Sequence, residues 1–311
     1  MFWRLRQTLN RTWFNNLCRG ILKTPAIEPS EDGVMLLSMV SHLDIMMYLV
    51  AIKSFYRHLK RGKIVVLNDG TLTEKDKRLL ATHINPLQVL NINEVKTHPC
   101  PKGAWWERLL LIADYVKDHY VIQLDSDSLV ISEIPEVMEC VNRNISFALG
   151  SDFNINGEYL GKEIFPMDYV CQKMKLLKND YIEVVADQNL DKLPDYSTLK
   201  YSRCSACFAG FAKGSFSRRE VEDFSGKMQG ILGKRWSEWG TEKITSAYIV
   251  SNSPRARILP YPKYVSYYAD PAIDYTKSAY LHFTGTHRFK NGFYINMARK
   301  VIQTLMPEGR N

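Results

Sequence analysis

Short apolar runs alternate with helical patterns between Gly33 and Leu124, and this alternation constrains the fold more than any other feature of the sequence. Strand-like runs cover residues 34–40, 63–67, 87–92 and 119–124, and helical patterns at 44–56, from Thr73-x-x-Asp76 onward, and at 105–116 separate them. Strands divided by helices in this way form parallel βαβ units. We therefore predict an α/β fold in a single continuous domain, with a mixed, mostly parallel central sheet flanked by helices.

The N-terminal residues 1–30 form a distinct segment, which we predict to be an amphipathic basic helix followed by a linker. Arginines and amides lie on one face of this helix, no acidic residue precedes Glu28, and Pro25 and Pro29 end the pattern. Apolar residues recur at helical spacing on the other face: Phe2, Leu5, Leu9, Trp13, Leu17 and Ile21. Two interpretations stay open, a helix lying on an anionic membrane surface and a helix packed on the body of the protein.

The rest of the chain is predicted to be one domain over 31–290 and a C-terminal helix over 291–311. Within the domain we expect a nucleotide-sugar-binding half at about 31–150 and an acceptor-side half at about 151–290. No apolar run reaches the roughly 18 residues that a membrane-spanning helix needs. Six scattered cysteines do not suit a disulfide scaffold. We expect a cytoplasmic protein, with a peripheral position on the cytoplasmic face of the inner membrane as a further hypothesis.

The most informative motif is an acidic turn at the end of the fourth predicted strand. Asp125 and Asp127 flank Ser126 directly after the apolar run, where ligands bind in open parallel sheets. Two carboxylates this close repel each other unless a cation joins them, and hard oxygen ligands suit Mn²⁺ or Mg²⁺. The net charge of +8 favours a polyanionic partner such as a phosphorylated substrate, an anionic lipid or a nucleic acid.

With this acidic turn the chain resembles the nucleotide-sugar glycosyltransferases of the GT-A (Rossmann-like) fold, which carry Asp-x-Asp after a central strand. Three further motifs resemble the family-8-like retaining branch: Trp106-Glu107-Arg108-Leu109 on the preceding helix, His282-Phe283-Thr284-Gly285-Thr286-His287-Arg288 near the end, and Glu242 in Trp239-Gly240-Thr241-Glu242-Lys243. The sequence departs from the family pattern at Arg288, which replaces lysine, at Phe289-Lys290 for Pro-Trp, at Lys243 for glutamine and at Ser205-Ala206-Cys207 for Asn-Ala-Gly.

The resemblance implies a metal-dependent enzyme that moves a sugar from a nucleotide-diphosphate sugar, with a UDP-sugar favoured, to a glycan or lipid-linked acceptor with retention of configuration. It implies Asp125, Asp127 and His282 as ligands of Mn²⁺ or Mg²⁺, and Glu242 near the reacting sugar. The nucleotide-sugar contacts it implies are Ser41, Asp44, Asp69, Arg108, Asp125, Ser126, Gly285 and Arg288. An anionic membrane surface is a further expected partner, and no nucleic acid is expected.

Other interpretations accompany these expectations. Asp69 lies in Asn68-Asp69-Gly70, which forms a turn for local reasons, and Asp44 is equally suited to cap a helix. A sugar nucleotidyltransferase would share the α/β architecture, but residues 39–42 lack its Gly-rich, Arg-containing signature. A membrane-surface or nucleic-acid binding module would explain the charge and leave Asp125, Asp127 and His282 unexplained.

Overall fold

The computed structural model describes the backbone of residues 2–307, and side chains other than those of residues 2–6 and Ala206. The expectations for the side chains of Phe2 and Leu5 therefore lie outside the described residues. The chain divides into two compact units, each assembled from separated segments. Unit 1 comprises the residues up to Ile92, Leu124–Pro135 and the chain from Pro262 onward, and unit 2 comprises Asn93–Gln123 and Glu136–Tyr261. Both units take segments from both predicted halves of the domain.

The main sheet has seven strands in the order β12-β6-β11-β4-β1-β2-β3. Strand β1 (Val34–Val40) runs parallel to β2 (Lys63–Asn68), with Met35 opposite Lys63 and Val40 opposite Asn68. Strand β3 (Gln88–Asn91) extends this parallel pairing on the far side of β2. Strands β1 and β2 contain apolar runs and are almost entirely buried, as expected for parallel strands covered on both faces, whereas β3 at the end of the sheet is partly exposed. The predicted α/β class with a mostly parallel sheet is confirmed.

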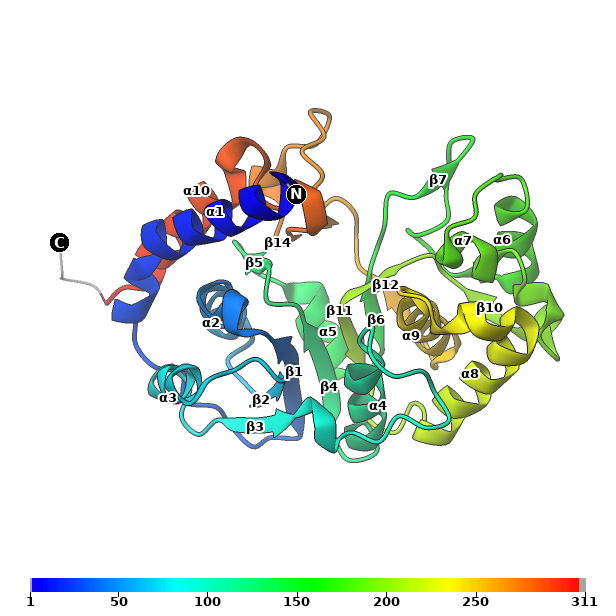
Figure 1. Cartoon of the computed structure of the whole chain (residues 1–311), viewed down its shortest axis with the longest axis horizontal. Coiled ribbons are helices and arrows are strands. Elements are labelled where there is room, and N and C mark those ends of the chain that lie inside the picture. The colour runs from blue at the N-terminus through cyan, green and yellow to red at the C-terminus, as the bar shows by residue number, and fades with distance from the viewer. Residues whose placement is uncertain (1, 308–311) are drawn as a thin grey trace. The chain divides into compact units, whose positions relative to one another are not determined.

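Unit 1 packs helices around β1, β2 and β3 (Figure 1). Its helices are α1 (Phe2–Leu17), α2 (Ile45–Leu59), α3 (Glu74–His83) and α10 (Phe293–Leu305). Helix α3 begins as its sequence indicates, because the Thr73 side chain accepts from the Asp76 amide while the Asp76 carboxylate accepts from the Thr73 amide. Short 3-10 turns complete the unit: η1 (Arg19–Lys23), η2 (His42–Asp44), η7 (Tyr275–Lys277), η8 (Gly285–His287) and η9 (Lys290–Gly292), with η3 (Ile92–Glu94) at its border.

A second, three-stranded sheet in unit 1 has the order β13-β14-β5. Strand β14 (Tyr280–His282) runs antiparallel to β5 (Ser128–Val130) and parallel to β13 (Tyr264–Ser266). Its pairing with β5 places His282 opposite Ser128. Two chain segments that are far apart in the sequence are thereby held in fixed register at the point where the acidic turn ends.

The N-terminal helix packs on unit 1, and the face that it buries is not the predicted apolar face. Phe14 and Cys18 are fully buried, and the ring centroids of Phe14 and Tyr294 in α10 are 4.6 Å apart. Of the described residues of the predicted apolar face, Leu9, Trp13 and Leu17 in α1 are exposed, and Ile21 in η1 is buried. The prediction is therefore corrected in two respects, because α1 ends at Leu17 before η1 and because its buried side is the one that carries Phe14.

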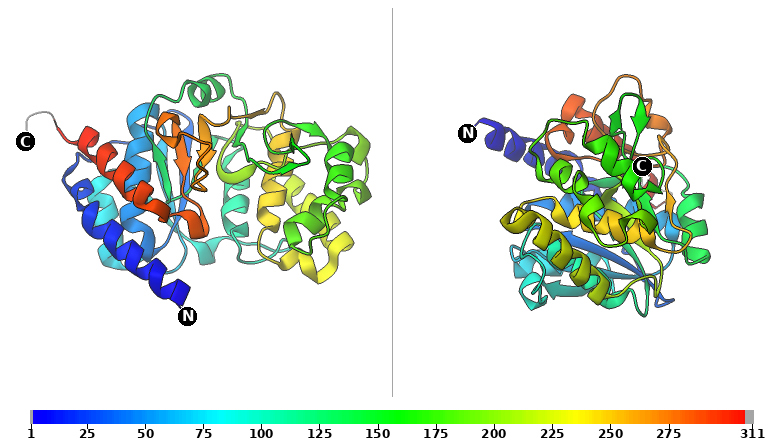
Figure 2. Two further views of the ribbon diagram at one scale, coloured as in Figure 1. Left: turned by 90° about the horizontal axis from the view of Figure 1, so that it is seen from above. Right: turned by 90° about the vertical axis from the view of Figure 1, so that its right-hand side faces the viewer.

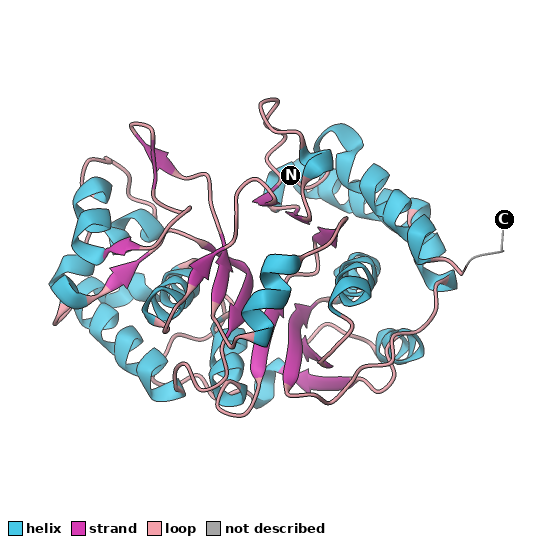
Figure 3. Ribbon diagram, turned by 180° about the vertical axis from the view of Figure 1, so that it is seen from behind, coloured by secondary structure: helices cyan, strands magenta, loops and turns pink. Residues whose placement is uncertain are grey.

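Unit 2 combines the other part of the main sheet with a largely helical region, and Figure 3 distinguishes its strands from its helices. Its main-sheet strands are β4 (Tyr120–Leu124, whose last residue belongs to unit 1), β6 (Phe147–Leu149), β11 (Ser205–Phe211) and β12 (Arg257–Ile258). The short pairs are β7 (Asn154–Ile155) with β8 (Glu158–Tyr159), and β9 (Phe165–Pro166) with β10 (Lys200–Tyr201). The helices and 3-10 turns are α4 (Trp106–Tyr115), α5 (Pro135–Asn142), α6 (Met167–Met174), α7 (Ile182–Asp187), α8 (Arg218–Leu232), α9 (Thr241–Asn252), η4 (Leu190–Lys192), η5 (Tyr196–Thr198) and η6 (Gly233–Ser237).

Among the helices of residues 2–307, none combines the length and the apolar character that crossing a bilayer requires.

Candidate metal and nucleotide site

The acidic turn leaves the sheet between a buried strand and a short return strand. All five residues of β4 are buried, and Asp125, Ser126 and Asp127 connect it to the buried strand β5. The side chain of Asp127 is 8% exposed and that of Asp125 is 25% exposed. The two carboxylates are therefore held at a strand end, and Asp125 keeps access to solvent.

Backbone pairing brings His282 to this turn. His282 is the last residue of β14, and the amide of the next residue, Phe283, donates to the carbonyl of Asp127 over 2.8 Å. Two buried hydroxyls, Ser128 Oγ and Tyr280 Oη, also share a hydrogen bond of 2.6 Å between the two strands. These contacts fix the position of β14 relative to the turn.

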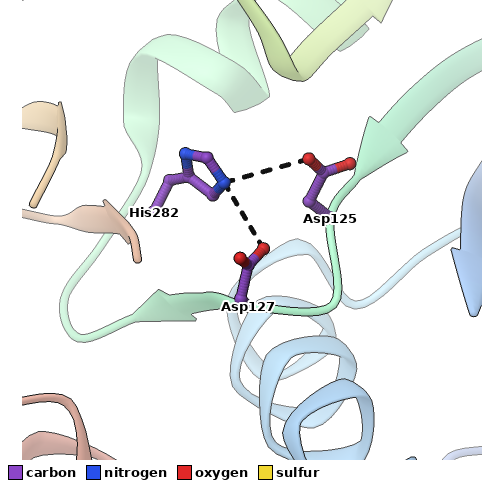
Figure 4. Close-up of side chains that lie close together, drawn as sticks. All are labelled: Asp125, Asp127 and His282. Carbon is purple, nitrogen blue, oxygen red and sulfur yellow. Dashed lines mark ion pairs between the residues drawn. The ribbon is translucent and has the colours of Figure 1, made fainter. Parts of the chain in front are cut away.

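The three side chains form one cluster in unit 1 (Figure 4). His282 Nε2 lies 3.4 Å from Asp127 Oδ1 and 3.9 Å from Asp125 Oδ2. One potential ligand atom from each residue lies within 4.8 Å of the others. The other ring nitrogen of His282 shares a hydrogen bond of 3.3 Å with Ser266 Oγ of β13, which orients the ring.

Arg288 faces the same carboxylate from the other side. Its Nη2 donates to Asp127 Oδ2 over 2.5 Å, and its Nε donates to the Phe283 carbonyl over 3.1 Å. Burial disfavours the charged form of Asp127, but the charges of Arg288 and His282 outweigh burial and hold the pKa of this carboxyl well below its usual range. Asp127 is therefore an anion, and its two oxygens face the Arg288 guanidinium and the His282 imidazole.

A second carboxylate of unit 1 continues this ion-pair chain. Asp44 Oδ1 lies 4.0 Å from Arg288 and 3.2 Å from Nη2 of Arg11 in α1. Asp44 occupies the N-cap position of α2, but its side chain makes no capping hydrogen bond; its Oδ2 accepts from Ser41 Oγ over 2.8 Å instead. The chain Arg11–Asp44–Arg288–Asp127 thus links the N-terminal helix to the acidic turn.

An aromatic cluster supports the loop that carries Arg288. Phe283 stacks on Tyr294 with ring centroids 4.0 Å apart, and Tyr294 also contacts Phe14 and Phe289. Phe14 belongs to α1 and Tyr294 to α10, so both terminal helices pack beneath the loop 283–289. The position of Arg288 therefore depends on packing that involves both ends of the described chain.

The other predicted residues of unit 1 lie in turns. Asp69 Oδ1 accepts from the amide and the hydroxyl of Thr71, over 3.0 Å and 2.6 Å, so Asp69 forms the local turn that its sequence indicates. Gly285 opens η8 with a φ of +47°, a conformation that favours glycine, and no atom lies within 4 Å of the position a Cβ would take. Ser126 is the partly exposed central residue of the acidic turn.

Arg108 and Glu242 meet each other in unit 2. Arg108 Nη2 lies 3.5 Å from Glu242 Oε1, and both side chains are at most 5% exposed. Glu242 lies in the first turn of α9, where the helix dipole favours a carboxylate. Arg108 of α4 therefore neutralises a buried glutamate, a pairing that the sequence did not predict.

Two residues of the site were missed by the sequence analysis. Arg11 was assigned to the polar outer face of a terminal helix, and Ser266 was not singled out. Neither carries a recognisable motif. For Arg11 the only signal was its position three residues before Phe14. Ser266 offered no signal, because its contact with His282 arises from the pairing of β13 with β14.

Comparisons with known proteins bear on the fold. No protein-family model and no curated protein matches the sequence. Among solved structures, the glycosyltransferase GlyE of Streptococcus pneumoniae TIGR4 has a TM-score of 0.50 and 13% identity, covering 90% of this chain and 66% of its own. The galactosyltransferase LgtC, solved with donor and acceptor sugar analogs, has a TM-score of 0.49 and 12% identity, covering 88% of this chain and 98% of its own. Core-mannan synthase A of Aspergillus fumigatus, in an Mn/GDP form, has a TM-score of 0.42 and 10% identity, covering 76% of this chain and 74% of its own. The likeness to GlyE shows that this chain shares the fold of that solved glycosyltransferase, which confirms the predicted fold.

Proposed function

We propose that this chain is a metal-dependent glycosyltransferase that uses a nucleotide-diphosphate sugar as donor. One observation carries the proposal: two carboxylates of the turn after β4 and the imidazole at the end of β14 converge within 4.8 Å, and Arg288 lies against one of the carboxylates. A metal ligand set next to a guanidinium suits a diphosphate, because the metal and the cation neutralise the same group. The glycosyltransferase fold supports this interpretation.

The donor set of the cluster fits Mn²⁺ or Mg²⁺. Asp125 and Asp127 offer oxygen ligands, and His282 offers a neutral ring nitrogen through Nε2 because Nδ1 is engaged by Ser266. When bound, the metal neutralises charge on the departing diphosphate. Two carboxylates and one imidazole leave coordination positions for phosphate oxygens.

The other predicted residues of unit 1 have separate roles in the transfer reaction. Transfer breaks the bond between the sugar C1 and a diphosphate oxygen and forms a bond from C1 to an acceptor hydroxyl oxygen, whose proton passes to the leaving diphosphate. Arg288 stabilises the negative charge on the leaving diphosphate, and the open backbone at Gly285 lets a phosphate approach the loop. Ser41, Asp44, Asp69 and Ser126 contact the nucleoside and the donor sugar in this proposal.

The finer assignments rest on the sequence motifs. We assign a UDP-sugar donor, retention of configuration and a glycan or lipid-linked acceptor. Glu242 is 1% exposed and paired with Arg108, so we assign the two as a positioning pair and not as groups that touch the sugar. A Glu242→Gln variant should lower kcat with little change in KM for the donor, and Glu242→Asp should restore part of the loss.

The test is a panel of UDP- and GDP-sugars incubated with Mn²⁺, Mg²⁺ or EDTA, with the released products identified. We expect metal-dependent release of nucleoside diphosphate from one donor, whereas release or consumption of pyrophosphate would indicate a nucleotidyltransferase. Asp127→Asn should lose this activity, and Asp180→Asn, whose side chain is 92% exposed, is the matched control that should keep it. Metal-independent turnover, or full activity of Asp127→Asn, would contradict the proposal.

A further inference from the structure

Helix α1 presents a stripe of large apolar side chains to solvent. Leu9, Trp13 and Leu17 are 56%, 66% and 49% exposed, and they follow one another at four-residue spacing. Side chains four residues apart lie on one face of a helix, so the stripe is continuous over about 12 Å. Exposed large apolar side chains are common singly, but three in a row on one helix face indicate a surface that something covers.

The opposite face of α1 holds this stripe in its outward orientation. Phe14 and Cys18 are fully buried, and Arg11 pairs with Asp44 over 3.2 Å. Beyond the helix, the buried Lys53 ammonium donates to Thr24 Oγ1 over 2.8 Å and to the Pro25 carbonyl over 2.6 Å, which secures the linker. The stripe therefore cannot turn inward without breaking buried contacts.

Basic side chains accompany the stripe. The segments α1, η1 and α10 together contain seven Lys or Arg residues and no Asp or Glu. Helix α10 lies beside α1 (Figure 2), and Gly20 in η1 is close enough that a Cβ there would lie 3.1 Å from Ile302. The exposed basic residues of this region are Arg19, Lys23, Arg299 and Lys300.

We propose that this face of unit 1 docks on the surface of a phospholipid bilayer that contains anionic lipids. Leu9, Trp13 and Leu17 enter the boundary between headgroups and acyl chains, and the basic residues of η1 and α10 contact the anionic headgroups. An apolar stripe with a tryptophan, flanked by basic residues, has the chemistry of an interfacial helix. The proposal concerns where the protein resides and does not depend on which donor it uses.

The charge distribution favours a bilayer over a second copy of the chain. If two copies met through this face, the seven Lys and Arg residues of α1, η1 and α10 would face the same seven residues of the second copy. Those segments contain no acidic residue that could pair with them. A nucleic acid would satisfy the cations but would leave the stripe of Leu9, Trp13 and Leu17 without an apolar partner. Only a bilayer surface offers both an apolar layer and a negative potential.

The experiment is co-sedimentation of the full chain with vesicles of phosphatidylcholine alone or with 30% phosphatidylglycerol, without donor or metal. We expect binding to the anionic vesicles that weakens in high salt. The variant Leu9→Ser with Trp13→Ser should bind at least about tenfold more weakly, because two exposed apolar anchors are lost. The matched control, Leu176→Ser with Trp239→Ser, changes side chains that are 61% and 53% exposed in unit 2 and should bind as the parent does.

Charge is tested separately with Arg299→Gln and Lys300→Gln. Each removed cation should weaken binding to anionic vesicles roughly fivefold, and neither should change the weak binding to neutral vesicles. Full vesicle binding by the Leu9/Trp13 variant would overturn the proposal, as would an absence of binding by the parent. Two other results would also overturn the proposal. If light scattering showed dimerisation that the Leu9/Trp13 variant abolishes, the face would be assigned to a second copy. If RNA competed with the vesicles and eliminated binding to them, the face would be assigned to a nucleic acid. Removing residues 1–24 is not a suitable test, because it also removes Phe14 and Arg11 from unit 1.

Discussion

Arg288 donates a hydrogen bond of 2.5 Å to Oδ2 of Asp127, while Oδ1 of the same carboxylate faces His282 at 3.4 Å. One oxygen of the carboxylate therefore contacts a guanidinium, and the other faces the imidazole of the proposed metal site. In the proposed function, this arrangement lets Asp127 contribute to the metal site while it positions Arg288 for the phosphates. Three predictions test the residues around it, and a fourth tests a buried histidine elsewhere in unit 1.

Arg288→Lys is expected to keep metal binding and to raise KM for the donor about tenfold, because lysine preserves the charge but cannot form the same forked contacts. Arg288→Leu should lose most activity, since it removes the charge and leaves Asp127 without its strongest partner. Donor kinetics at saturating Mn²⁺ provide the measurement. Arg235→Lys is the control, because Arg235 pairs with Asp180 and Glu238 in unit 2. An unchanged KM in Arg288→Lys would show that the guanidinium fork is not used.

Ser266→Ala should weaken Mn²⁺ binding about tenfold, because the hydrogen bond to Nδ1 orients the His282 ring. The expected result is a shifted Mn²⁺ titration at constant donor, with kcat restored at high metal concentration. Ser278→Ala is a matched control, since Ser278 is also buried but donates to the Pro262 carbonyl. Equal titrations for the two variants would mean that Ser266 does not act through His282.

The pair Arg11 and Asp44 should be coupled by about 1 kcal/mol in the free energy of unfolding, since both side chains are partly buried. A double-mutant cycle with Arg11→Gln and Asp44→Asn, measured by urea denaturation, gives this coupling. Additive effects would show that α1 is held by Phe14 and Cys18 alone. A coupling that disappears when Arg288→Leu is introduced would demonstrate that the ion-pair chain acts as a unit.

Acid should destabilise the protein through His83. This imidazole accepts from the buried Lys53 ammonium over 3.0 Å, and burial followed by the Lys53 charge lowers the pKa of His83 from 6.5 to about 4. Between pH 4 and 6.5 the unfolded chain therefore binds a proton that the native state does not, so stability rises with pH across this window. We expect His83 to contribute a loss of about 2 kcal/mol on acidification from pH 7 to 4.5. Urea denaturation of the parent and of His83→Asn measures it, and parallel pH profiles for the two proteins would contradict the assignment.

The sequence was sufficient for the elements whose signals are local. The run 34–40 became β1, Thr73 and Asp76 form the predicted capping box, and the acidic turn follows a buried strand as its apolar run indicates. Each of these features depends on residues a few positions apart. His282 was predicted to join the turn through the family resemblance, and the pairing of β14 with β5 brings it there.

What the sequence could not specify is which side of an amphipathic helix packs. The apolar stripe of α1 would suit a core or a lipid surface equally well by its spacing, and only tertiary packing shows that Phe14 points inward while Trp13 points outward. The same limit applies to Arg11 and to Glu242. Their partners, Asp44 and Arg108, lie far away in the sequence, so no local pattern could identify the ion pairs.

The central claim is that Asp125, Asp127 and His282 bind a divalent metal together with the nucleotide. The most direct measurement is an anomalous difference map, at the manganese absorption edge, from crystals soaked in MnCl₂ and UDP. The account predicts one strong peak within coordination distance of these three side chains, with diphosphate density on the same ion and beside Arg288. Bound UDP without a manganese peak at these residues, or a peak that excludes Asp127 and His282, would contradict it.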